Sequence, residues 1–196
     1  MTRGPDKQFD RDEALGKAME VFWAQGYEAT GVTELLEHMG IGRQSMYDTF
    51  GSKRSLFLEV LHRYCDELGR RLIAQLRAPG SPLGNIRKVF GIWEDLLTDR
   101  GEVGCLVGNT VGELGPHDRE AAATLRSSLE GVEQALAETL SRAQAEGELG
   151  ADLDAHELAS LMVVTVQGTA LLRKVYGGPG LARSVLRGFM SMLERK

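Results

Sequence analysis

Apolar residues recur at spacings of three and four along nearly the whole chain, and no alternating pattern typical of a strand persists. The first apolar stripe follows Asp10 and Glu13, whose spacing is that of a capping box at a helix start. Its members are Leu15, Ala18, Met19, Phe22 and Trp23. Gly26 is a typical residue for the end of this helix. The pattern therefore favours an all-α fold that opens with an amphipathic helix.

The rest of the chain divides into further helices separated by glycine and proline. Two short helices are expected at 32–39 and 43–50, and a long one runs from a Ser52 cap to about residue 76. Beyond a Pro- and Gly-rich break at 78–82, we expect helices at 85–98, 105–114, 119–146, 154–176 and 181–193. The sequence thus predicts about nine helices, in an N-terminal domain at 8–68 and a C-terminal domain at 80–196.

Composition and charge narrow the class of protein. The chain of 196 residues has 42% apolar and 26% charged residues, which is typical of a globular protein. Its net charge is −5, and residues 1–54 alone carry seven basic and nine acidic residues (7 − 9 = −2), so bulk charge does not indicate nucleic-acid binding. Two cysteines make no disulfide framework, and the first residues show no export signal, so we expect a cytoplasmic protein. The longest uncharged run, 158–172, is too short and polar for a membrane span.

Residues 31–50 have the form of a helix-turn-helix, because two short helices flank the turn Gly40-Ile41-Gly42. The inner faces are apolar and comprise Val32, Leu35, Leu36, Met39, Ile41, Met46 and Phe50. Arg43, Gln44 and Ser45 are polar at the start of the second helix, where a guanidinium suits guanine and an amide suits adenine. Tyr47 lies one turn further along. This arrangement is typical of a second helix that enters the major groove of DNA.

Lys53 and Arg54 open the next predicted helix. There, cationic side chains and free backbone N–H groups both suit a phosphate. The two residues therefore predict a backbone contact beside the base-reading helix.

These residues also resemble a known family. Gly26-Tyr27, Thr30, Gly40-Ile41, Arg43 to Tyr47, Phe50, Ser52-Lys53 and Leu56 are similar to the N-terminal domain of the tetracycline-repressor (TetR) family. The resemblance covers about residues 10–60. It implies a nine-helix dimeric regulator in which helices one to three bind DNA, helix four links, five to seven enclose a ligand, and eight and nine pair with a second copy. It places the following residues at the DNA: Thr33, Arg43, Gln44, Ser45, Tyr47 and Lys53.

Some positions depart from the family pattern. Gly42 stands where a serine or threonine usually caps the recognition helix, Gly31 replaces a frequent hydroxyl residue, and Thr49 replaces a frequent histidine. The resemblance therefore supports the motif more firmly than it supports phosphate contacts at these three positions.

The C-terminal half predicts a ligand region and a pairing surface. An apolar cavity with a few polar groups is the usual form of a small-molecule site. Candidates for its lining are Phe90, Trp93, Asn109, Thr110, Glu113, His117, Met162, Arg173 and Tyr176. The apolar run 158–172 and the half-apolar segment 181–193 are explained either by burial within the monomer or by a four-helix homodimer interface. Dimerisation is favoured because two recognition helices read twice as many bases as one.

Cys105 is a candidate redox sensor. It lies at the expected start of the sixth helix, where the helix dipole favours negative charge. The stretch Gly104-Cys105-Leu106 is similar to that of family members that sense electrophiles or oxidants through a cysteine, so modification of Cys105 is one hypothesis for DNA release. The alternative is a small packing residue, which the frequent burial of free cysteines favours. Cys65 lies within an apolar stripe and is interpreted as core.

No catalytic or metal-binding pattern is evident. The four histidines, His38, His62, His117 and His156, have no metal-motif spacing, and neither a catalytic triad nor a phosphate-binding loop appears. We therefore expect no cofactor and no enzyme activity, although an enzyme or a protein-interaction module on the same helical frame is the alternative class. The expected function is a ligand-released repressor that binds double-stranded operator DNA as a homodimer and answers an unidentified small-molecule effector. An activator, or a thiol-based sensor that uses Cys105, is the alternative.

Overall fold

The computed structural model describes residues 9–98 and 105–194, and in these ranges it contains nine α-helices and no strand. The helices are α1 (Arg11–Gln25), α2 (Val32–Met39), α3 (Arg43–Phe50), α4 (Lys53–Leu76), α5 (Pro82–Thr98), α6 (Leu106–Glu113), α7 (Arg119–Ala145), α8 (Ala155–Tyr176) and α9 (Gly180–Leu193). The predicted all-α class is therefore confirmed. Four starts differ from the prediction: α5 begins at Pro82 rather than Asn85, because proline suits the first helical position, and α6, α8 and α9 each begin one residue away from the predicted start.

Capping side chains fix several helix starts. The Asp10 carboxylate accepts from the backbone N–H of Asp12 (2.8 Å) and of Glu13 (3.1 Å). Ser52 and Asp154 cap α4 and α8 in the same way, as their sequence positions predict. These local bonds satisfy N–H groups that the first turn leaves without partners.

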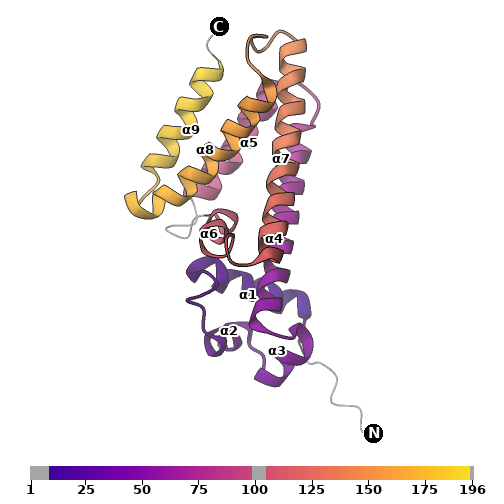
Figure 1. Cartoon of the computed structure of the whole chain (residues 1–196), viewed down its shortest axis with the longest axis vertical. Coiled ribbons are helices and arrows are strands. Elements are labelled where there is room, and N and C mark those ends of the chain that lie inside the picture. The colour runs from indigo at the N-terminus through magenta and orange to yellow at the C-terminus, as the bar shows by residue number, and fades with distance from the viewer. Residues whose placement is uncertain (1–8, 99–104, 195–196) are drawn as a thin grey trace.

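Helices α1 to α3 and the first turns of α4 form a head at one end of the molecule, and the remaining helices form a body (Figure 1). The head has an aromatic core. Phe22 packs edge-on against Phe57 with ring centroids 5.0 Å apart, and Tyr27 lies 5.0 Å from the same Phe57. Both phenylalanines are fully buried. The part of the apolar core that lies in the head is therefore centred on the contact between α1 and α4.

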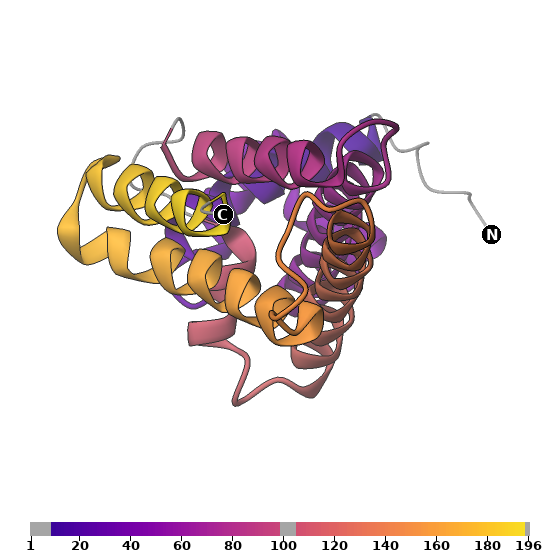
Figure 2. The same ribbon diagram turned by 90° about the horizontal axis from the view of Figure 1, so that it is seen from above.

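In the body, α4 packs along α7, and α7 packs along α8 (Figure 1). Seen from above, α5, α8 and the pair of α4 and α7 form three sides of a triangle (Figure 2). The apolar stripes of these helices point inward. The interior of the triangle is therefore where the C-terminal half holds its core.

Helix α8 is long and apolar enough to cross a membrane by length and composition, and it is the one such helix in the described ranges. The uncharged run 158–172 is shorter than a span, but the helix extends it at both ends. Its stripe of Ala159, Met162, Val166 and Ala170 is buried in the bundle. A core helix of a soluble bundle can be equally long and apolar. One face of α8 is apolar because it packs inside the bundle, and the other face carries the exposed apolar surface described below.

Candidate nucleic-acid interface and ligand cavity

The α2–α3 pair is held by apolar side chains on its inner faces. Gly40 adopts the left-handed conformation (φ +69°) that ends α2 and starts the turn, a conformation that favours glycine. Val32 and Leu36 are partly buried. The fully buried members of the predicted inner set are Leu35, Met39, Ile41, Met46 and Phe50. The inner face of the predicted helix-turn-helix is therefore confirmed.

The exposed positions of α3 carry polar residues. Arg43 is exposed and makes no ion pair within the described ranges, and the side-chain amide of Gln44 donates to Asp48 at 2.9 Å. Tyr47 is 40% exposed, whereas Phe50, three residues later, is buried. Ser45 is half-buried in the first turn. The structure thus brings Arg43, Gln44 and Tyr47 to the outer surface of one short helix.

The starts of α2 and α3 are open to an anion. Their N-cap residues, Gly31 and Gly42, have extended backbones and make no side-chain capping hydrogen bond. Thr33 lies exposed in the first turn of α2. Because the first N–H groups of a helix have no partner within the helix, both ends can bind phosphate oxygens directly.

The two cations at the start of α4 have different surroundings. The Lys53 ammonium lies over the ring of Tyr27, 4.4 Å from its centroid. Arg54 instead faces the body: its Nε and Nη2 donate to the two carboxylate oxygens of Asp118 at 2.7 and 2.9 Å, and Nη2 also donates to Glu120 at 3.1 Å. A bidentate carboxylate pair thus occupies the Arg54 guanidinium in this structure, and its phosphate contact stays a prediction.

Asp118 serves two helices at once. Its carboxylate caps α7, accepting from the N–H groups of Glu120 and Ala121 at 3.0 Å each, and pairs with Arg54 of α4. The Arg54 guanidinium and the N–H of Ala121 lower the pKa of Asp118 to about 2. Asp118 thus links the start of α7 to the head.

A second carboxylate joins the head to α6. Glu113, the last residue of α6, accepts from the N–H of Tyr27 at 3.0 Å and of Glu28 at 2.6 Å. The approach requires Gly26, because a Cβ there would lie 2.7 Å from a Glu113 carboxylate oxygen. The sequence suggested Glu113 as a cavity residue. Its actual partners are 85 and 86 residues away in the chain, and no local pattern signals them.

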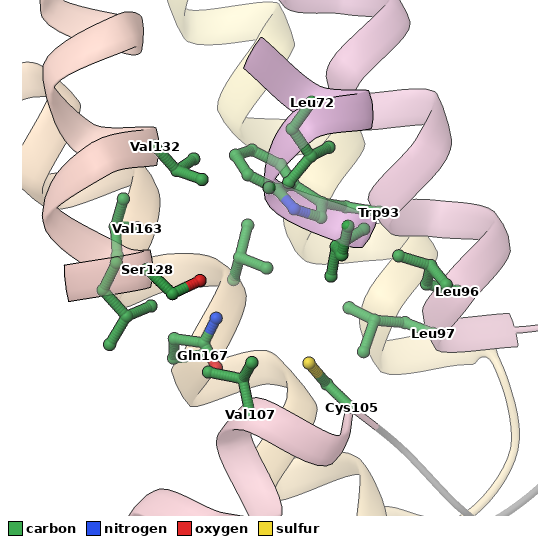
Figure 3. Close-up of a pocket in the computed structure, with 14 residues that line it drawn as sticks. Leu72, Trp93, Leu96, Leu97, Cys105, Val107, Ser128, Val132, Val163 and Gln167 are labelled. Carbon is green, nitrogen blue, oxygen red and sulfur yellow. The ribbon is translucent and has the colours of Figure 1, made fainter. Parts of the chain in front are cut away.

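A small cavity of about 40 Å³ lies inside the body, between α4, α5, α7, α8 and the start of α6 (Figure 3). Its lining is mostly aliphatic and carries no charged side chain. The lining residues are Leu68, Gly69, Leu72, Trp93, Leu96, Leu97, Cys105, Val107, Ser128, Leu129, Val132, Val163, Val166 and Gln167.

Of the lining residues proposed from the sequence, Trp93 lies at this cavity and the others do not. Tyr176 is exposed. Arg173 is buried, at 3% exposure, with no ion pair in the described ranges and one guanidinium nitrogen without a partner. The sequence placed the large and polar residues of the C-terminal half at the site, whereas short aliphatic side chains form most of the wall.

The two cysteines have different positions. Cys105 is the N-cap residue of α6 and its sulfur faces the cavity (Figure 3), 3.7 Å from the Tyr64 hydroxyl. Tyr64 in turn packs edge-on against Trp23 of the head, with ring centroids 4.9 Å apart. Cys65 lies in the core, where burial raises the pKa of its thiol to about 11.

Helices α8 and α9 present an apolar surface on their outer side. Val175 and Tyr176 are 83% and 71% exposed, and Val164 is 67% exposed. The remaining exposed apolar residues of this pairing surface are Leu161, Leu171, Leu172 and Met192. A large exposed apolar area on a monomer usually marks an interaction site.

Comparison with known proteins matches both halves of the chain. The sequence profile described as bacterial regulatory proteins, tetR family, matches residues 14–60, and that of the tetracyclin repressor-like C-terminal domain matches residues 82–189. The chain belongs to the TetR family. This TetR-family protein is therefore a transcriptional regulator of the helix-turn-helix type, as the resemblance of residues 10–60 implied.

Relatives of this TetR-family regulator cover most of its length. The helix-turn-helix transcriptional regulator YezE of Bacillus subtilis is 39% identical over 80% of this chain and 81% of its own. The transcriptional repressor ComR of Escherichia coli is 34% identical over 87% and 82%. The structure of a cysteine mutant of the TetR-family regulator CifR with 26-bp operator DNA has a TM-score of 0.82 and 29% identity, covering 97% of this chain and all of that one.

In the described ranges, no group of three or more His, Cys, Asp and Glu residues is placed to hold a metal ion.

The Asp118 pair predicts a pH-dependent contribution to stability. Because its pKa is about 2 in the folded state and about 3.9 in an unfolded chain, the ionised carboxylate stabilises the fold above about pH 4, and this effect is lost as the pH falls toward 2. We expect Asp118→Asn to lower the free energy of unfolding, measured by urea titration, at pH 6, and by about half as much near pH 3. Asp95→Asn, at an exposed site on α5, is the control. An equal loss for Asp118→Asn at both pH values would contradict this role.

Proposed function

We propose that this regulator is a ligand-released repressor that binds a near-palindromic operator as a homodimer. The observation that carries the proposal is the exposure of Arg43, Gln44 and Tyr47 on a short helix that buries Met46 and Phe50. The proposed DNA-binding domain spans residues 8–68, with the helix-turn-helix at about 31–50, and the ligand-binding and dimerisation domain spans 80–196. It acts in the cytoplasm, where the DNA is, and has no catalytic role.

The proposed roles follow from side-chain chemistry. Arg43 donates two hydrogen bonds to a guanine edge, and Gln44 exchanges its bond to Asp48 for an adenine edge. Ser45 and Tyr47 contact the groove edge or a thymine methyl group. Thr33 and Lys53 contact phosphates. The open N-termini of α2 and α3 add backbone donors to the same phosphates, which offsets the low positive charge of the head.

The pairing surface of α8 and α9 supports the homodimer. A two-fold pairing buries Val164, Val175 and Tyr176 of both copies in a four-helix interface. The same two-fold axis relates the two heads, and their recognition helices then meet successive major grooves about 34 Å apart. This geometry explains why one eight-residue helix per copy is enough for discrimination.

Ligand release rests on the contacts between body and head. The start of α6 forms part of the cavity wall, and its end carries Glu113, which holds the turn between α1 and α2. A molecule in the cavity that binds more tightly when α6 is shifted therefore also moves the head through Glu113. Because a ligand shifts an equilibrium only by its difference in affinity for the two states, the effector must bind the DNA-free arrangement more tightly. ComR, a named repressor, supports repression as the sign of regulation.

A thiol-based sensor is the second candidate, because the Cys105 sulfur faces the cavity rather than solid core (Figure 3). An adduct on Cys105 occupies the same space as an effector. It also displaces the Tyr64 hydroxyl, which packs toward Trp23 of the head.

Arg43→Ala tests the base-reading role. We expect a loss of about 1–3 kcal/mol in operator binding and a relaxed preference at one base pair of each half-site, measured by fluorescence anisotropy with wild-type and substituted operators. Lys53→Ala, by contrast, should weaken binding to all sequences alike and reduce the salt slope by about 1. Arg126→Ala, at an exposed arginine of α7, is the matched control. Unchanged affinity and base preference in Arg43→Ala would show that α3 does not read the operator.

Val164→Asp tests the pairing surface. We expect a shift from dimer to monomer in sedimentation velocity, with unchanged helical circular dichroism, because the substitution buries an unpaired charge in the interface. Leu153→Asp, at an exposed leucine before α8, is the control and should remain a dimer. A Val164→Asp protein that stays dimeric places the interface elsewhere.

Treatment with N-ethylmaleimide separates the two candidates. If Cys105 is the sensor, the wild-type and Cys65→Ser proteins lose operator binding after treatment, while Cys105→Ser keeps it. Cys65 should contribute little, because a thiol with a pKa of about 11 holds almost no thiolate at pH 7. Operator binding that treatment leaves intact in the wild type, or abolishes in Cys105→Ser, would exclude the sensor.

A further inference from the structure

We infer that the effector is a small, uncharged, mainly apolar molecule with one hydrogen-bond-accepting oxygen, held by the side-chain amide of Gln167. The inference rests on the proposed function in one respect: it takes the cavity of the body as the effector site. It adds the chemical class of the ligand and the residue that orients it.

The charge of the ligand follows from the cavity wall. None of the lining residues is Lys, Arg, His, Asp or Glu. Arg173 is a buried cation of the same helix as Gln167, but it is not part of the lining. An ion moved from water into such a wall loses several kcal/mol of solvation without a partner to offset it. A neutral molecule of the same shape has no such penalty.

The size of the ligand follows from the volume. A single water needs about 10–15 Å³, so the cavity of about 40 Å³ admits a molecule of only a few bonded non-hydrogen atoms. Its walls come from five helices with Leu72 on α4, Trp93 on α5 and Val132 on α7 facing one another (Figure 3). Packed aliphatic walls of this kind suit a short hydrocarbon skeleton.

The polar contact comes from Gln167. Its amide points from α8 into the cavity, near Cys105 and Val107 of α6 (Figure 3). The amide makes no hydrogen bond within the described ranges, and its oxygen is buried without a partner. A Cβ at Gly108 would lie 3.1 Å from that oxygen, so the oxygen packs against α6 and the NH₂ group is left for the cavity.

Ser128 is a second polar group of the wall, and its hydroxyl also influences the Cys65 thiol of α4, whose pKa it lowers. Because the Gln167 nitrogen points into the cavity, its N–H can donate to an oxygen of a bound ligand. The geometry therefore points to a ketone, aldehyde, ester or ether oxygen on a short apolar skeleton.

The test uses three probes of matched size: 2-butanone, propanoate and sec-butylammonium. Binding is followed by the indole N–H resonance of Trp93 in ¹⁵N-labelled dimer, with Trp23→Phe to assign the two indoles. We expect 2-butanone to shift the Trp93 resonance saturably, and both ions to bind more than about a hundredfold more weakly. Equal binding of either ion would overturn the inference.

Gln167→Leu, which keeps the volume and removes the amide, tests the orienting contact. We expect it to weaken 2-butanone binding by about 3- to 10-fold. Gln134→Leu, at an exposed glutamine of α7, is the matched control, and thermal melting by circular dichroism checks that both variants fold. Unchanged affinity of 2-butanone for Gln167→Leu would exclude the proposed role of Gln167.

Operator binding, measured in the same samples, separates the inference from the proposed function. If 2-butanone occupies the cavity and weakens operator binding, both stand. If it occupies the cavity and operator affinity is unchanged, the ligand class stands and release by ligand falls. If no probe binds while the operator is bound, the ligand class falls and the DNA-binding role stands.

Discussion

The display of α3 depends on two apolar anchors. A helix of eight residues is too short to be stable alone in water, so tertiary packing must hold it. Met46 and Phe50 provide that packing, and the Arg11 guanidinium lies over the Phe50 ring, 5.1 Å from its centroid. With these two side chains fixed inside, the helical period directs Gln44 and Asp48 to the outer surface. Arg43 is exposed because it is the first residue of the helix, and Tyr47 lies at the edge of the buried face.

Two carboxylates join the head to the body, in addition to the apolar core that the two parts share. Asp118 binds Arg54 of α4, and Glu113 binds the turn after α1. Both lie at the ends of helices that approach the cavity or flank it. Charged hydrogen bonds of this kind are strong but depend on geometry. A small shift of α6 or α7 therefore breaks them, whereas aliphatic contacts tolerate the same shift. In the proposed release by ligand, these contacts carry a shift of α6 or α7 to the head.

The sequence predicts what local chemistry controls. The spacing of apolar residues located the helices. As predicted, α1, α4 and α8 are capped by Asp10, Ser52 and Asp154. The residues predicted for the inner face of the helix-turn-helix are all buried or partly buried. The junction was not predictable, because Arg54 and Asp118 lie 64 residues apart and neither sits in a motif that names its partner. The cavity wall was missed for a related reason. Its members, such as Val107, Val132 and Val163, belong to ordinary apolar stripes, and their shared space arises from how five helices cross.

The central claim is that a pair of α3 helices reads DNA from a symmetric dimer. Selection of bound sequences from a random duplex library, followed by hydroxyl-radical footprinting, tests it most directly. The account predicts a near-palindrome with two protected half-sites on one face, about one helical turn apart or a multiple of it. Failure to enrich any sequence, or protection of a single asymmetric site, would contradict it.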